Sequence, residues 1–121
     1  MSNLFTDITN EFDGQDIDNN KVLSLFAYLG PLVLVPILAA KDSRFARFHA
    51  NQGLVMLLVS IAIAIIEGIL VRIPVLGWII YIAYILASIC IFALSIYGIV
   101  NAVTGKAIKF PFIDKINLIK Y

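Results

Sequence analysis

Residues 53–71 read GLVMLLVSIAIAIIEGILV, and this run with a single charged side chain decides the fold class. At a rise of about 1.5 Å per residue, a helix of that length crosses roughly 30 Å, the thickness of the hydrocarbon core of a bilayer. Two further stretches, 22–40 and 73–103, contain no charged residue. The sequence therefore predicts an all-α, polytopic membrane bundle of three transmembrane helices with flanking interfacial amphipathic helices.

The composition agrees with a membrane protein. Hydrophobic residues make up 61% of the chain and charged residues 14%, whereas soluble domains have about 45–50% and about 25%. We expect an acidic segment at 1–20, either a short amphipathic helix (Ser2, Leu4, Phe5, Ile8, Phe12) or disordered. A membrane domain follows at 21–104, with spans near 22–40, 53–72 and 77–103, and then a basic interfacial tail at 105–121. No cleavable signal peptide is expected, because residues 1–20 lack a basic start and an apolar run.

The first apolar stretch carries Gly30, Pro31 and Pro36. Proline removes a backbone donor and clashes with the preceding turn, so a kink near the bilayer midplane is expected. A broken helix that lines a transport site is the alternative.

Basic residues predict the topology. Lys41, Arg44 and Arg47 lie between the first two stretches, and four lysines follow the last. The positive-inside rule then places the C-terminus in the cytoplasm and the N-terminus outside, in the bacterial inner membrane. If 22–40 is instead a re-entrant hairpin, the N-terminus is cytoplasmic too.

The segment between the first two stretches is the candidate lipid or partner interface. A helix capped by Asp42 or Ser43 would hold basic groups at anionic headgroups and aromatic rings at the acyl boundary. The candidate residues are Lys41, Arg44, Phe45, Arg47, Phe48, His49, Asn51 and Gln52.

Two further sets of residues lie within the spans. Small residues let membrane helices approach, so Ser60, Ala64 and Gly68, with Ala83 and Ala87, are predicted packing positions against the chain's own helices or a second copy. Intramembrane acids often mark functional sites. We expect Glu67 either to hydrogen-bond Tyr81 or Tyr84 or to extend towards the headgroups.

Nothing in the sequence predicts an enzyme. Cys90 is the only cysteine and His49 the only histidine, so no zinc ligand set is present. A phosphate loop and a nucleophile–base spacing are also missing. We predict no catalytic residue, cofactor, metal or nucleic-acid partner. The predicted partners are membrane lipids with anionic headgroups and other membrane proteins or a second copy.

Three segments carry a resemblance to a known family: NKVLSLFAYLG at 20–30, AAKDSRFARFHANQG at 39–53, and NAVTGKA at 101–107 with FPF at 110–112. They resemble a family of small bacterial membrane proteins of unknown function. That family is grouped by distant similarity with the chloroplast inner-envelope protein-import (Tic) component. The resemblance implies a compact three- or four-helix membrane domain and no catalytic residues.

The leading functional hypothesis is a non-enzymatic scaffold or accessory subunit that binds other membrane proteins. A small transporter or channel subunit using Glu67 and the Pro31 break is one alternative. An immunity protein against a membrane-targeted toxin is another.

Overall fold

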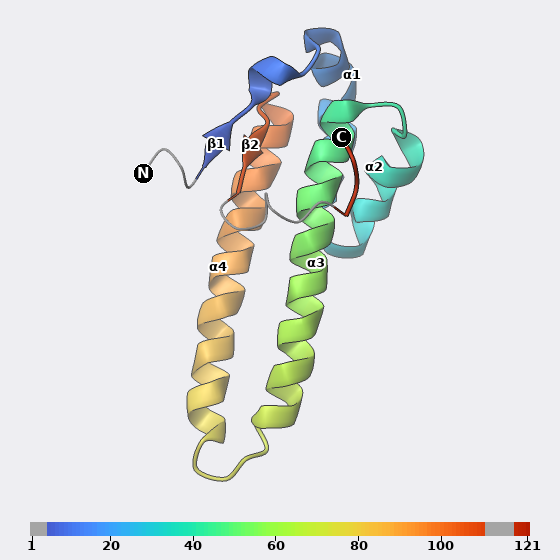
Figure 1. Ribbon diagram of the computed structural model, residues 1–121. Helices are drawn as coiled ribbons and strands as arrows, with labels where there is room; N and C mark the ends of the chain where they lie inside the picture. Colours follow the sequence, from blue (N-terminus) through green and yellow to red (C-terminus); the bar gives the residue numbers. More distant parts are fainter. Residues whose placement is uncertain (1–4, 111–117) are drawn as a thin grey trace.

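The computed structural model describes residues 5–110 and 118–121. Two long antiparallel helices, α3 and α4, form a hairpin, and the other elements gather at one end of it (Figure 1). We call that gathered end the cap. The elements are β1 (Thr6–Asp7), the 3-10 helix η1 (Thr9–Glu11), α1 (Gly14–Leu25), the 3-10 helices η2 (Phe26–Tyr28) and η3 (Gly30–Val33), α2 (Leu34–Ala39), α3 (Arg44–Leu70), α4 (Gly77–Val103) and β2 (Ile108–Lys109).

The hairpin helices begin and end where local chemistry dictates. Ser43 caps α3, because its hydroxyl accepts a 3.0 Å hydrogen bond from the amide of Ala46. Gly77 opens α4 at a close approach, since a Cβ there would lie 2.2 Å from the carbonyl oxygen of Val71. Gly105 ends the helical region with a φ of +76°, as expected for a glycine stop signal.

Only α3 and α4, among the described residues, are long and apolar enough to cross a membrane. Each has 27 residues, or about 40 Å. A core helix of a soluble protein would be mostly buried, whereas the most apolar windows of α3 and α4 are 17% and 0% buried. The surface of the hairpin away from the cap is therefore suited to lipid.

The expected first span at 22–40 is not a single helix, which corrects the prediction of three transmembrane helices. The stretch contains the end of α1, then η2, η3 and the six-residue α2. Gly30 has a φ of +64°, a conformation that interrupts any right-handed helix. Pro31 starts η3 and Pro36 lies inside α2, so the predicted kink is a complete reversal of the chain.

The two ends of the described chain meet in the cap. β1 pairs antiparallel with β2, with Thr6 opposite Lys109. Both strands therefore lie at the same end of the hairpin. This is the arrangement expected for the re-entrant alternative and not for an N-terminus outside with a C-terminus inside, and the topology itself stays a prediction.

The N-terminal segment also differs from the expected amphipathic helix. Residues 5–12 contain β1 and η1, and α1 begins at Gly14 and continues past residue 20. Ser2 and Leu4, and residues 111–117 of the predicted basic tail, lie outside the described residues.

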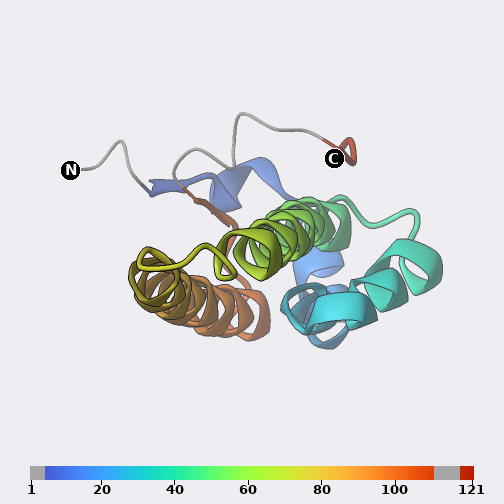
Figure 2. The ribbon, with the colours of Figure 1, turned by 90° about the horizontal axis from the view of Figure 1, so that it is seen from below.

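Buried apolar side chains form two clusters around the first turns of α3. One contains Phe12, Phe45 and Phe48, with ring centroids of Phe12 and Phe48 5.6 Å apart. The other surrounds Tyr28 and Met56. Viewed along the hairpin, α3 lies between α4 and α2, with the strand pair on another side (Figure 2). The cap therefore encloses the start of α3, which explains why only this part of the helix is buried.

Gly53 is predicted to be intolerant of alanine. A Cβ there would lie 1.8 Å from the carbonyl oxygen of Ala27, whereas a Cβ at Gly68 on the same helix meets nothing within 4 Å. We expect Gly53→Ala to lower the free energy of unfolding by about 1–3 kcal/mol through overpacking. Gly68→Ala should be neutral or stabilising, because alanine is the better helix former. Thermal unfolding in detergent measures both, and equal unfolding temperatures would contradict the packing described for Gly53.

The shared position of the two ends predicts a labelling pattern. In a Cys90→Ser background, single cysteines replace the exposed residues Asn10, Lys120 and Val75. An impermeant thiol reagent should reach positions 10 and 120 from one side of the membrane and position 75, in the hairpin turn, from the other. Reaction of position 10 together with position 75 would contradict the hairpin topology.

Candidate functional site

A buried polar network inside the cap is the candidate functional site. Tyr28, at the end of η2, lies with its hydroxyl 2.6 Å from Nδ1 of His49. Gln52, one turn further along α3, donates a 2.9 Å hydrogen bond from Nε2 to the same hydroxyl. All three side chains are buried, so the polar groups of η2 and α3 satisfy one another without solvent.

The partners of His49 define its protonation. Its Nε2 lies 2.9 Å from the carbonyl oxygen of Lys106, which can only accept, so Nε2 carries the hydrogen. Nδ1 then accepts from the hydroxyl of Tyr28, and the imidazole is neutral. Because the hydroxyl of Tyr28 donates in this bond, the bond requires a protonated phenol.

The same face of α3 holds the end of the chain. Oε1 of Gln52 accepts a 2.8 Å hydrogen bond from the amide of Phe110. Oδ1 of Asn51 accepts from the amides of Leu118 and Ile119, at 2.7 and 3.0 Å. Two adjacent amide side chains therefore hold the backbone of Phe110, Leu118 and Ile119 against α3.

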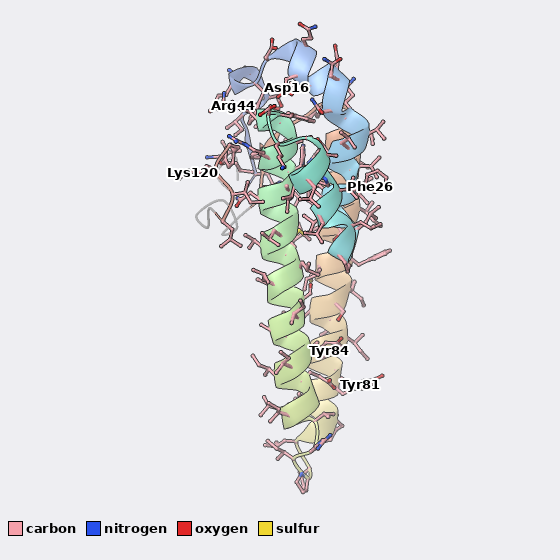
Figure 3. The ribbon with its side chains drawn as sticks, turned by 90° about the vertical axis from the view of Figure 1, so that its right-hand side faces the viewer. Asp16, Phe26, Arg44, Tyr81, Tyr84 and Lys120 are labelled. Atoms are coloured by element: carbon pink, nitrogen blue, oxygen red, sulfur yellow. The ribbon has the colours of Figure 1, made fainter. Side chains whose placement is uncertain are left out.

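Two charged side chains, Arg44 on α3 and Asp16 on α1, link segments of the cap to one another (Figure 3). Arg44 donates from Nε to the carbonyl oxygen of Tyr121 at 2.7 Å, and its guanidinium lies 5.1 Å from the ring centroid of Phe12. Asp16, on α1, accepts a 3.0 Å hydrogen bond from the amide of Phe45. A carboxylate at a helix N-terminus is favourable, because it complements the helix dipole and an unpaired amide.

A short turn near β1 adds a further link. Thr9 donates from its amide and hydroxyl to the carboxylate of Asp7, and these hydrogen bonds hold the pKa of Asp7 below its usual value. The hydroxyl of Thr9 in turn accepts from the amide of Ala107 at 2.9 Å. This turn therefore joins the two ends of the chain next to the strand pair.

The structure corrects the predicted lipid or partner interface. Of the eight candidates, Phe45, Phe48, His49, Asn51 and Gln52 are buried within the cap. Their rings and amides contact protein, because α1, η2, Phe12 and the chain end pack against the start of α3. Lys41 and Arg44 remain exposed, and Arg47 is half-buried with an Nε that has no hydrogen-bond partner in the described chain.

The predicted packing positions divide between two surfaces. Ala83 and Ala87 line a cavity of about 190 Å³ between α3 and α4, which also contains Glu67 and Tyr84. Ser60 is half-buried, and its hydroxyl donates to the carbonyl oxygen of Met56 at 2.8 Å. Ala64 and Gly68 are exposed on the outer surface of α3, so the chain's own helices do not cover them.

The predicted intramembrane polar site is only partly assembled. Glu67 is half-buried and Tyr84 lines the same cavity, whereas Tyr81 is 52% exposed and lies on the outside of α4 (Figure 3). Within residues 5–110 and 118–121, Glu67 makes no hydrogen bond to either tyrosine. Cys90 is exposed on α4.

Sequence reasoning missed Tyr28 and Asn101. Tyr28 lay inside an apparent span, and its only signal was a hydroxyl in an apolar run. Gly98 on α4 faces its ring, where a Cβ would lie 2.5 Å from the nearest ring carbon. Asn101 is buried one turn later, and its Nδ2 has no partner among the described residues.

In chemical terms the network is structural. His49 is inaccessible to solvent, and both of its ring nitrogens are occupied. The described residues contain no group of three or more His, Cys, Asp or Glu side chains able to hold a metal ion. The arrangement can bind η2, α3 and the chain end to one another.

Comparison with known proteins gives a family match over most of the chain. Residues 20–119 match a family described as the magnetosome magnetite crystal formation protein family. The magnetosome protein MmsF of Paramagnetospirillum magneticum is 34% identical over 94 residues, which cover 77% of this chain and 80% of the relative. The magnetosome protein MamF of Magnetospirillum gryphiswaldense is 30% identical over 91 residues, covering 74% and 75%.

A membrane protein of Methanocaldococcus jannaschii is 37% identical over 78 residues, covering 64% of this chain and about half of the relative, 51%. No solved structure matches the chain. These matches support the resemblance to a small bacterial membrane family. They give no support to the similarity with the chloroplast import component.

The hydroxyl of Tyr28 is predicted to hold the cap together. Tyr28→Phe leaves Nδ1 of His49 and one hydrogen of Gln52 without a buried partner, which costs about 1–3 kcal/mol. We expect faster amide exchange at Phe110, whose partner is Gln52, and a lower unfolding temperature. Tyr81→Phe is the matched control, because that ring is exposed. Equal exchange in both variants would contradict a structural role for the network.

Proposed function

Because this chain belongs to the magnetosome magnetite crystal formation protein family, we propose that it is a non-enzymatic accessory subunit located in a membrane. It acts by binding other membrane proteins, or further copies of itself, through the apolar outer surface of the α3–α4 hairpin. The cap at one end gives the hairpin a rigid base. The observation that carries this proposal is the division of the molecule into two parts. In the cap, buried polar groups hydrogen-bond to one another, whereas the hairpin has an uncovered apolar surface.

The outer surface of α3 supports a protein partner there. Ala64 and Gly68 lie one turn apart on that surface, and a Cβ at Gly68 would meet open space. Isoleucines at 61 and 65 flank them and are 48% and 59% exposed. Small residues beside larger ones let a second helix approach closely and pack, which is the main source of helix association in lipid.

The cavities of the hairpin favour an accessory role over transport. The cavity beside Glu67 is lined by Ile63, Ile66, Ile80 and alanines, with Tyr84 as the other polar side chain. A conducting path needs polar groups that replace water around the ion. Among the described residues, the neighbouring cavities between α3 and α4 add the hydroxyls of Ser60, Ser88 and Ser95 but no charged side chain.

The names of the relatives suggest where in the cell the proposed role is carried out. Two of them are magnetosome proteins, and the family description refers to magnetite crystal formation. In a host that forms magnetosomes, the proposal places this chain in the magnetosome membrane as a partner of other proteins. The chemistry of crystal growth would then belong to those partners.

Photo-crosslinking in native membranes tests the proposal. A photoreactive residue at position 65, beside Ala64 and Gly68, should form adducts with a membrane protein or a second copy. The same residue at Ile82, which is 47% exposed on α4, is the matched control. Filling the surface with Ala64→Leu and Gly68→Leu should remove the adduct at 65.

Two results would overturn the proposal. One is an adduct yield at position 65 no greater than that at 82. The other is ion flux in vesicles reconstituted with the purified chain, abolished by Glu67→Gln, because this result requires a conducting path.

A further inference from the structure

The depth of the cap in a bilayer follows from the length of the hairpin. About 20 helical residues cross a 30 Å hydrocarbon core. Counting back from Leu70, the last residue of α3, that distance ends near residue 51, close to the start of the apolar run at Gly53. The turn between α3 and α4 carries Arg72, so this turn lies at one headgroup layer and the cap at the other.

The re-entrant segment, residues 26–39 (η2, η3 and α2), reaches into this core from the cap side. Gly30, at its reversal, lines a cavity together with Met56, Ser60 and Ile91. Residues 56–60 lie 10 to 14 positions before Leu70, which corresponds to about 15–21 Å along the helix. The reversal therefore lies near the middle of the core and does not reach the other headgroup layer.

The charges at the two ends of the segment agree with this placement. Lys21 precedes it on α1, and Lys41 follows the end of α2. The stretch between them, 22–40, is uncharged. A segment that starts and ends at charged residues and reverses at Gly30 enters and leaves through one leaflet.

The outer side of the segment is apolar and uncovered. Leu32, Leu34 and Leu38 are 47%, 54% and 64% exposed. At the depth derived above, the outer surfaces of α3 and α4 are also apolar and exposed. Acyl chains of the cap-side leaflet are therefore the occupant that fits, because the same solvent surrounds the adjacent helices at this level.

This arrangement places unequal volumes in the two leaflets. The cap-side leaflet holds α3, α4 and the two limbs of the re-entrant segment, whereas the other leaflet holds α3 and α4 (Figure 1). A helix about 10 Å across occupies roughly 80 Å², so two extra limbs add on the order of 150 Å² to one leaflet. Apolar insertion into a single leaflet is sensitive to membrane curvature.

We propose that the chain recognises membrane curvature: its re-entrant segment is a one-leaflet wedge that favours bilayers convex on the cap side. The partner is the lipid of the cap-side leaflet. This inference is independent of the accessory role proposed above, which depends on the outer surface of α3.

Sorting between flat and tubular membrane tests the wedge. The full chain, labelled at Asn10→Cys in a Cys90→Ser background, is reconstituted into giant vesicles from which narrow tubes are pulled outwards. An impermeant quencher separates molecules with the cap outside from those with the cap inside. We expect molecules with the cap outside to be enriched on tubes roughly two-fold or more, and the inverted molecules to be depleted.

A graded series of side chains provides the matched control. Replacing Leu32, Leu34 and Leu38 together by alanine should reduce the enrichment, and replacing them by phenylalanine should increase it. The same replacements of Ile79, Ile82 and Leu86 on α4, which are exposed in the other leaflet, should change the enrichment in the opposite direction. Each alanine replacement removes three carbon atoms in both sets, so the number of atoms lost is matched.

Several outcomes would overturn the wedge. Equal density on tubes and flat membrane for both orientations is one, and the same sign of sorting in both orientations is another. A crosslinked dimer through positions 32 or 38 would show that a second copy covers the segment instead of lipid. Each of these leaves the photo-crosslinking result at position 65 unaffected, so failure here is distinguishable from failure of the accessory role.

Discussion

The fold depends on the docking of one tyrosine between two long helices. Tyr28 lies against α4 where Gly98 leaves room for its ring, and its hydroxyl bonds His49 and Gln52 on α3. This contact holds the reversal of the chain against the hairpin. All three side chains are buried within protein, so an unpaired hydroxyl, imidazole or amide would cost more free energy here than at a surface.

The need to pair buried polar groups also accounts for the organisation of the cap. The side-chain oxygens of Asn51 and Gln52 accept hydrogen bonds from backbone amides of the chain end. The carboxylate of Asp16 accepts one from the amide of Phe45 at the start of α3. These bonds join segments that lie far apart in the sequence. The result is one rigid end and one bare hairpin, and this division underlies both the accessory role and the curvature preference that we propose.

Much of the helical structure followed from residue types alone. Ser43 as the cap of α3, Gly77 as the start of α4 and Gly105 as the stop are local effects of side-chain oxygens and of glycine. The errors arose where apolar character was taken as a span. Residues 22–40 are as apolar as a membrane helix, but the conformation of Gly30 and the two prolines reverse the chain there.

The sequence by itself determined that long apolar helices dominate the chain and where α3 and α4 begin and end, because hydropathy and capping act over a few residues. The tertiary structure alone decided that Phe45, Phe48, His49 and Gln52 are buried and that the strand pair joins the two ends of the chain. Arg44 through Gln52 has the composition of an interfacial helix, and its burial depends on which distant segments cover it. Those contacts connect residues separated by 21 positions (Tyr28 and His49) to 77 positions (Arg44 and Tyr121), and no local pattern encodes them.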